Sequence, residues 1–217
     1  MKISLKIFFI LIFSAVFLFF SCSNAKPEIK YGFIQSVLLN NTAEGPKEHF
    51  SFFIIPHDDD GIENLDELHL YHDREQLRWI IKSGEWITLT QDGSTWIGTR
   101  SITSRETYLP RGVFRAVLVN KGGDSTERYF TFDGNARYAF PEIEISGGIF
   151  NVNSAWPVNK LIGYDSSGSY AATVNLSSMS GNVSDLGFSS NVRSAALWAE
   201  DVSSFCAAIT NIISIRD

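Results

Sequence analysis

The sequence predicts an all-β protein in which an antiparallel β-sandwich over residues 31–134 is followed by a second small β-rich domain or extension over residues 138–217. Two observations support this fold class. Short apolar or alternating runs recur at intervals of roughly ten residues, separated by clusters of Gly, Asn, Asp and Ser that are typical of turns. Long runs with the periodicity of a helix are scarce.

The clearest signal in the first part of the chain is the Asp92-Gly93 pair. It stands between two alternating runs, which is a strong indication of a β-hairpin. The continuous apolar run His49–Ile55 predicts a strand that is covered on both faces. The strands expected in this part are Tyr31–Leu39, His49–Ile55, Asp66–His72, Leu77–Ile81, Trp86–Thr90, Thr95–Gly98, Val113–Asn120 and Glu127–Phe132.

A second hairpin is expected around the glycine-rich turn Lys121–Ser125. Its first strand belongs to the segment Pro110–Val119 (PRGVFRAVLV), which resembles the last hairpin of bacterial immunoglobulin-like and fibronectin-III-like domains. Seven or so strands over about 100 residues is also the number expected of such a sandwich. The resemblance implies an Ig-like antiparallel β-sandwich, although the Cys–Trp–Cys framework of antibody domains is absent from the sequence.

The turn cluster Asp133-Gly134-Asn135 is the expected boundary, because the composition after it is poor in charge and rich in Ser, Asn, Gly and Ala. The run Ser194–Ala199 could open a helix, since Ala and Leu favour one, but the regular spacing of turns favours a strand. The strands expected here are Pro141–Ile145, Gly148–Val152, Lys160–Tyr164, Tyr170–Leu176, Val192–Ala199 and Ser204–Ile215.

Residues 1–21 are predicted to be a secretory signal. Lys2 and Lys6 precede the apolar run Ile7–Phe20, which is shorter than the roughly 20 residues of a membrane span. The following Ser21-Cys22 pair resembles the lipobox of bacterial lipoproteins, with the bulky residues before it that spirochaetal lipoproteins show. An ordinary signal peptide cleaved near Ala25 is the alternative, with Cys22 as a plain thiol.

The lipoprotein resemblance implies that Cys22 becomes the acylated N-terminus of the mature chain. Residues 22–30 would then form a short polar tether between the lipid bilayer and the folded body. Ser23 after the cysteine resembles lipoproteins that are sorted to an outer membrane. The resemblance therefore implies a lipid-anchored protein of the bacterial cell envelope, at the outer membrane and on its periplasmic or surface side.

The charge of the chain argues against two classes of partner. The whole sequence has a net charge of −6, and without the two lysines of residues 1–21 it is −8. An acidic chain without a basic cluster is not expected to bind nucleic acid or anionic lipid. The second cysteine, Cys206, lies in an apolar run, which predicts a structural thiol rather than a nucleophile.

A metal site is one hypothesis for the segment 57–73, which is rich in His and Asp. Imidazole and carboxylate groups suit zinc, and His57 and His72 would be its ligands. In the alternating run Asp66–His72, however, Leu68, Leu70 and His72 share one face of a strand and His69 lies on the other. Solvated loop and strand-edge histidines are therefore the favoured interpretation.

Calcium is a second hypothesis for the same segment. With Gly61 at the sixth position of an EF-hand loop, Asp58 takes the third position, Asp60 the fifth and Glu67 the twelfth. The standard loop fails because Pro56 occupies the first position, where Asp is required. A looser calcium site on a β-turn stays open, and an acidic turn without a bound ion is favoured over it.

Three tryptophans, Trp79, Trp86 and Trp96, could stack on sugar rings, but such residues more often fill a core, which is favoured here. No catalytic motif is recognisable: residues 163–168 break the register of a nucleophile elbow. The leading hypothesis is a non-enzymatic binding or scaffold module of the envelope, with a protein or glycan partner. The alternatives are a metal-assisted hydrolase that uses residues 57–73 and a calcium-stabilised carbohydrate-binding module.

Overall fold

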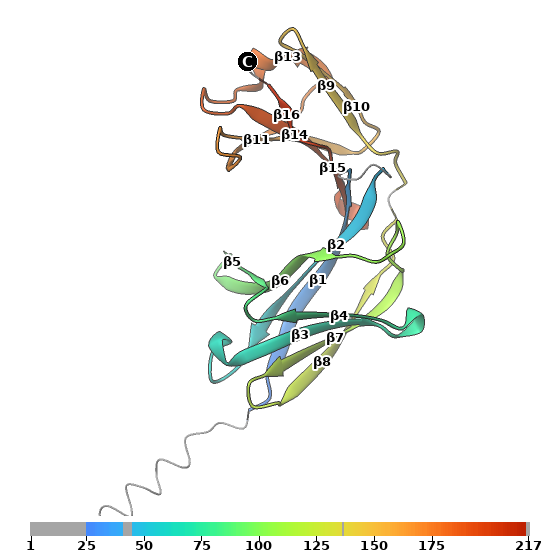
Figure 1. The fold of residues 1–217 in the computed structure, drawn as a ribbon, viewed down its shortest axis with the longest axis vertical. Helices are drawn as coiled ribbons and strands as arrows, with labels where there is room; N and C mark the ends of the chain where they lie inside the picture. The colour runs from blue at the N-terminus through green and yellow to red at the C-terminus, as the bar shows by residue number, and fades with distance from the viewer. Residues whose placement is uncertain (1–24, 41–44, 136, 216–217) are drawn as a thin grey trace, which may run out of the picture.

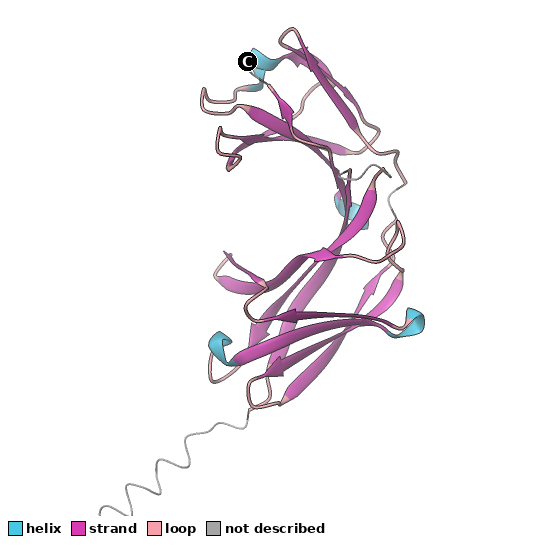
Figure 2. Ribbon diagram, in the orientation of Figure 1, coloured by secondary structure: helices cyan, strands magenta, loops and turns pink. Residues whose placement is uncertain are grey.

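The structure is a computed structural model that describes residues 25–40, 45–135 and 137–215. Strands organised in three sheets make up most of this part of the chain (Figure 1). Helical structure in the described residues is limited to four short 3₁₀ turns, and none of them is an α-helix (Figure 2). The prediction of an all-β protein is therefore confirmed.

The largest sheet, here called the main sheet, runs through both halves of the chain. Every pairing in it is antiparallel except that of β1 with β15, in which Ser36 lies opposite Cys206 and Leu39 opposite Ile209. The strand β16 (Ile213–Ser214) pairs with β14 beside this path. The strand order is β12 (Tyr170–Asn175), β11 (Val158–Tyr164), β14 (Ser194–Asp201), β15 (Cys206–Ile209), β1 (Glu28–Leu39), β2 (Lys47–His57), β6 (Ser94–Ile102) and β5 (Ile87–Gln91).

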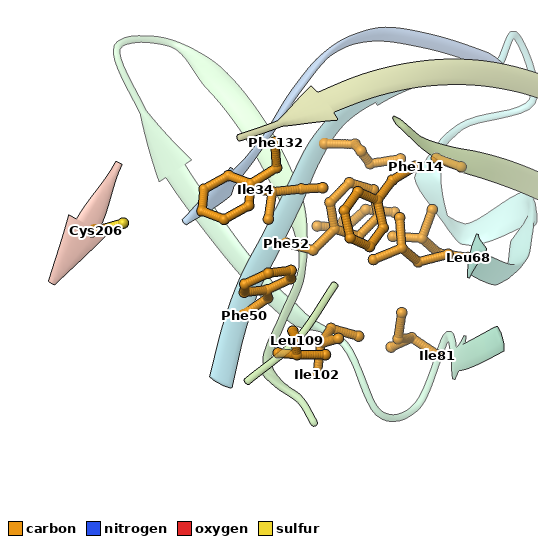
Figure 3. Packing of buried hydrophobic residues seen from close by; sticks show 14 of the residues in the cluster. Ile34, Phe50, Phe52, Leu68, Ile81, Ile102, Leu109, Phe114, Phe132 and Cys206 are labelled. Carbon is orange, nitrogen blue, oxygen red and sulfur yellow. The ribbon is translucent and has the colours of Figure 1, made fainter. Parts of the chain in front are cut away.

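A four-stranded sheet packs against the first half of the main sheet and completes a sandwich. Its order is β4 (Leu77–Lys82), β3 (Leu65–His72), β7 (Gly112–Asn120) and β8 (Ser125–Phe132). The orders β1-β2-β6-β5 and β4-β3-β7-β8 match strands A-B-E-D and C′-C-F-G of the immunoglobulin sandwich. Buried side chains between the sheets include Ile34, Phe50, Phe52, Leu68, Ile102, Phe114 and Phe132 (Figure 3).

The second half builds a smaller sandwich on the far end of the main sheet. Three strands, β13 (Ser180–Asn182), β10 (Ile149–Asn153) and β9 (Glu142–Ser146), form the facing sheet. Its core is a second apolar cluster, whose fully buried members are Leu161, Val192, Ala195 and Leu197. The larger cluster also holds Trp156, Ala199, Cys206 and Ala208, so the first core receives side chains from the second half of the chain.

Several local predictions are confirmed. Asp92 and Gly93 both have positive φ, 51° and 73°, and join β5 to β6 as the hairpin signal indicates. Leu68 and Leu70 face the core from β3, while His69 and Tyr71 contact each other on the opposite face. Ser194–Ala199 is part of a strand rather than a helix.

The predicted end of the tether and one predicted strand are wrong, and one strand was missed. The strand β1 begins at Glu28, because Ile29 is buried in the core, so the last residues of the predicted tether 22–30 belong to the sheet. The expected strand Ser204–Ile215 is divided into β15 and β16, and between them the Thr210 N–H donates to the carbonyl of Leu197. The short β13 lies in a Ser/Gly segment without any apolar alternation. The domain boundary at residue 134 stays a prediction, since the main sheet runs across it.

Candidate binding face

One face of the main sheet turns away from both smaller sheets and is hollowed (Figure 1). We call it the concave face. From Tyr31 onward the odd-numbered residues of β1 point to it, because the even-numbered ones, such as Ile34 and Leu38, are buried in the sandwich core. The side chains that define this face are Tyr31, Phe33, Gln35, Val37, Leu39, His49, Ser51, Phe53, Leu89, Trp96, Arg100, Lys160, Ile162, Thr173, Trp198, Glu200 and Ile209.

Aromatic rings form one end of the concave face. The Trp96 ring lies edge-on to the ring of Tyr31 at 5.7 Å and to that of Phe33 at 5.5 Å between centroids. Phe33 in turn stacks on Phe53 at 6.1 Å. Tyr31 is 52% exposed, and Leu89 at the rim is also exposed. A hollow of about 440 Å³ is lined by Phe33, Phe53, Leu89 and Trp96, and Tyr31 contacts Trp96 beside it. A partner would meet aromatic rings that are already ordered by one another.

Arg100 is the exposed cation near the middle of the concave face, whereas Lys160 on the same face is paired with Glu200. Arg100 lines both the aromatic hollow and a neighbouring hollow of about 600 Å³. Its guanidinium forms no ion pair with any described residue. His49 lies nearby, and burial together with Lys47 lowers the pKa of its imidazole, which favours the neutral ring. Arg100 is therefore available to an acidic or hydrogen-bonding group of a partner.

The other end of the concave face is organised by Trp198. Its indole Nε1 donates to Glu200 Oε2 at 2.6 Å, and Lys160 donates to the other oxygen of the same carboxylate. Ile162 and Ile209 flank this group and complete an apolar floor. The indole, the ion pair and the two aliphatic side chains together present a partly exposed surface.

Acid is expected to weaken this end of the sheet. Burial alone would raise the pKa of Glu200, but the hydrogen bonds from Lys160 and Trp198 outweigh it and leave that pKa below its ordinary value. The carboxylate therefore adds stability above the unfolded pKa of about 4.3, and this stability is lost as the pH falls through the lower folded value. Thermal melts should show the gap between wild type and Glu200→Gln closing on acidification. A gap that is independent of pH would contradict this assignment.

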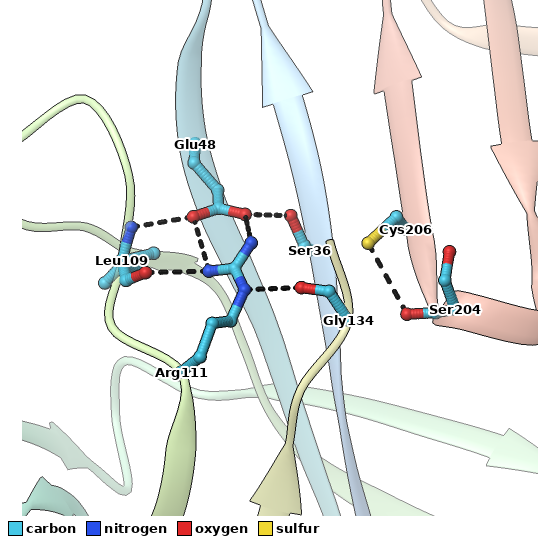
Figure 4. Close-up of polar contacts among 7 residues, drawn as sticks. All are labelled: Ser36, Glu48, Leu109, Arg111, Gly134, Ser204 and Cys206. Carbon is cyan, nitrogen blue, oxygen red and sulfur yellow. Dashed lines mark hydrogen bonds and ion pairs between the residues drawn. The ribbon is translucent and has the colours of Figure 1, made fainter. Parts of the chain in front are cut away.

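A buried polar cluster, here called the Glu48 clasp, lies behind the concave face (Figure 4). Glu48 on β2 is 1% exposed. Its carboxylate accepts two hydrogen bonds from the Arg111 guanidinium, at 2.6 and 2.9 Å, one from the Leu109 N–H at 2.7 Å and one from the Ser36 hydroxyl. Arg111 also donates to the carbonyls of Leu109 and Gly134. The clasp thus ties the loop before β7 and the chain after β8 to the two central strands.

The predicted calcium ligands are not assembled into a site. Asp58 is 6% exposed, and its Oδ1 accepts from the Asp60 N–H at 2.9 Å and from Asn64 Nδ2 at 3.1 Å. Its Oδ2 has no hydrogen-bond partner among the described residues. Glu67 instead pairs with His69 at 2.6 Å, which lowers the pKa of the Glu67 carboxyl. Asp58 therefore shapes the turn after β2, and calcium binding stays an untested prediction.

The histidines are also separated from one another. His57 is exposed and lies 3.4 Å from Asp59. His72 is buried: its Nε2 lies 3.0 Å from the Arg111 carbonyl oxygen, and its Nδ1 accepts from the Glu75 N–H. Within the residues that the structure describes, no group of three or more His, Cys, Asp or Glu side chains could hold a metal ion.

The tryptophans and cysteines singled out by the sequence lie in different environments. Trp79 and Trp86 pack against the core, as the favoured interpretation has it, and Trp79 donates to the Thr103 carbonyl at 2.7 Å. Trp96 lies on the concave face instead. Cys206 is buried, and burial raises the pKa of its thiol. Cys22 lies outside the described residues.

Sequence reasoning missed Trp198, Arg100 and the Glu48 clasp. The lone acidic residue Glu48 beside the apolar run HFSFFII is a signal that could have found the clasp, since a carboxylate in a buried strand requires a partner. Phe33, Gln35 and Val37 are alternate residues of β1 and therefore lie on the same face of the strand. Their mixed polarity could have indicated that this face is partly exposed.

No protein-family model matches the chain, and no curated protein matches it in sequence. Solved structures match the chain at low identity. The 47-kilodalton lipoprotein Tp47 of Treponema pallidum matches with a TM-score of 0.40 and 11% identity, over 88% of this chain and 52% of that one. The chain thus spans about half the length of that lipoprotein.

Two further structures match with lower scores. Latent PorU from Porphyromonas gingivalis has a TM-score of 0.34 and 13% identity, over 88% of this chain and 20% of its own. The BSP domain of a biofilm-associated protein has a TM-score of 0.28 and 13% identity, over 89% of this chain and 29% of its own. Scores this low do not establish a shared fold. None of the helices in the described residues is long and apolar enough to cross a membrane.

Proposed function

We propose that the chain is a lipid-anchored lipoprotein of the bacterial envelope that binds a protein or glycan partner on its concave face, without catalysing a reaction. The observation that supports this most is the concave face itself. It combines ordered aromatic rings, a cation without an ion pair and the Trp198 surface on one sheet. Partly exposed Trp, Tyr and Arg side chains are the residues that most often dominate binding energies.

The start of β1 close after Cys22 supports a folded body that lies near the membrane. The strand β1 begins at Glu28, six positions after Cys22, and six steps of about 3.5 Å reach at most about 21 Å. Tyr31 lies near the start of β1, so the aromatic end of the concave face would be the end closer to the bilayer. A module of this kind would hold its partner beside the membrane rather than at a distance from it.

Removal of either tryptophan from the concave face should weaken binding. We expect Trp96→Ala and Trp198→Ala each to lower the affinity at least tenfold, which corresponds to about 1.4 kcal/mol. The measurement is binding of the soluble body, residues 23–217, to a glycan array and to immobilised envelope proteins, followed for each hit by tryptophan fluorescence. Tyr129→Ala is the matched control, because Tyr129 is 57% exposed and lies on β8 of the four-stranded sheet, outside the concave face. Equal losses in all three variants would count against the concave face.

The anchor is tested separately. Mass spectrometry of the mature chain should show Cys22 as the N-terminal residue, with a diacylglyceryl group on its thioether. Cys22→Ala should move the protein from the membrane fraction to the soluble fraction, because two or more acyl chains are required for stable anchoring. An unmodified Cys22 in the mature chain would overturn the lipoprotein assignment and leave the concave face as an independent proposal.

A further inference from the structure

One edge of β1 is only partly paired. On this edge Ser36 N–H donates to the Phe205 carbonyl at 2.9 Å, where β15 runs parallel to β1. In a strand, the N–H and C=O groups of every second residue point to the same edge. Those of Gly32 and Ile34 therefore point to the same side as those of Ser36. The pairing with β15 begins at Ser36, so no described strand reaches Gly32 or Ile34 on this side.

The chain turns away at the place where β15 could have continued along β1. Phe205, which precedes β15, has a left-handed backbone with a φ of 53° and ends the 3₁₀ turn η4 (Val202–Ser204). At the other end, the Arg128 guanidinium donates to the carbonyls of Ile29 and Lys30 and occupies the edge there. The open part of the edge is therefore short and bounded on both sides.

A groove of about 720 Å³ lies along this open edge. Gly32 and Ile34 line one wall, and Phe130 and Phe132 of β8 line the opposite wall. Asp133 and Asp201 supply two carboxylates to its rim and Arg137 one guanidinium, so the charged side chains sum to −1. The groove thus combines unpaired backbone groups, aromatic walls and a slight negative charge.

We propose that this groove binds an extended polypeptide segment with a basic side chain, which adds to the main sheet as a strand beside Gly32 and Ile34. Such a segment would lie in line with β15 and would pair with the two N–H and two C=O groups that β15 leaves free. Backbone pairing at an open edge is the common way in which a sheet takes up an extended peptide. The groove meets the concave face at Tyr31 and Phe33, which line both. The inference rests on the free backbone groups of Gly32 and Ile34, and it does not depend on the function proposed above.

The state of the edge can be tested first in the free protein by amide hydrogen exchange. The N–H groups of Phe33 and Gln35 point toward β2, whereas those of Gly32 and Ile34 point into the groove. We expect the amides of Gly32 and Ile34 to exchange at least tenfold faster than those of Phe33 and Gln35. Equal protection in the monomer would overturn the proposal, and protection that rises with protein concentration would assign the edge to a second copy of this chain instead.

Peptide binding is tested by NMR on the ¹⁵N-labelled soluble body with a set of synthetic hexapeptides of alternating Thr and Val that carry Lys at different positions. Binding should protect the Gly32 and Ile34 amides at least tenfold, and N-methylation of alternate peptide bonds should abolish it. Ser203→Trp, at an exposed site in η4 that lines the groove, should block binding. Ser125→Trp, at an exposed site on β8 outside the groove, should not. Failure of every peptide to protect these amides, or equal binding of the N-methylated set, would overturn the proposal.

Discussion

Replacement of Arg111 by Met is expected to lower the free energy of unfolding by about 3–5 kcal/mol. The reason is the position of Glu48, whose carboxylate is 1% exposed and would lose both charged hydrogen bonds. A buried charge without a partner is much more costly than a missing surface ion pair. Urea unfolding followed by tryptophan fluorescence and circular dichroism measures the change.

The chain contains a matched control for this experiment. Arg115 also holds a carboxylate with two hydrogen bonds of 2.9 Å, but its partner Asp73 is exposed. That pair lowers the pKa of Asp73, yet an exposed ion pair contributes only about 0–1 kcal/mol. Arg115→Met should therefore cost far less than Arg111→Met. Equal effects would show that the Glu48 clasp is not a buried charge pair in solution.

A double substitution separates the effect of the unpaired charge on stability from the effect of lost packing. In Glu48→Leu/Arg111→Met both charges are removed, so no uncompensated carboxylate remains in the core. We expect this variant to recover much of the stability lost in Arg111→Met, because apolar replacements of buried ion pairs are often neutral or stabilising. The Gly134 and Leu109 carbonyls would still lose their donor, so recovery should be incomplete.

Local patterns predicted much of the fold because they depend on residues close in sequence. The Asp92-Gly93 turn, the alternation of β3 and the hairpin of β7 and β8 all follow from the periodicity of side chains and the conformational freedom of Gly. The favoured core position of Trp79 and Trp86 follows from their large apolar surface. Each of these predictions needs only a single strand or a hairpin.

The remaining features depend on pairings between distant residues. Ser36 and Cys206 are neighbours in the sheet although 170 positions apart, and no local pattern specifies that β15 pairs with β1 rather than with another strand. The concave face exists because this pairing joins Phe33 and Val37 to the surface around Trp198. The ion pair between Arg111 and Glu48 depends on the position of the loop before β7 over β2, and no local pattern in the sequence specifies that position. The site was therefore missed even where its strands were predicted.

The same long-range pairing makes a prediction about cooperativity. Phe52 is completely buried in the larger core and Leu197 in the smaller one. Phe52→Ala should cost about 3–5 kcal/mol and Leu197→Ala about 2–5 kcal/mol, because each leaves a cavity in a packed interior. Leu89→Ala, at a leucine that is 39% exposed, should change stability by no more than about 0.5 kcal/mol.

The number of unfolding transitions shows whether the two halves of the chain unfold together. The larger core contains Ala199, Cys206 and Ala208 from the second half of the chain, and β15 is hydrogen-bonded to β1. We therefore expect one transition whose midpoint falls in both core variants, with unchanged steepness in urea. Two transitions, each sensitive to only one of the two substitutions, would mean that the halves unfold independently. The β1–β15 pairing would then be a contact between two domains rather than part of one cooperative structure.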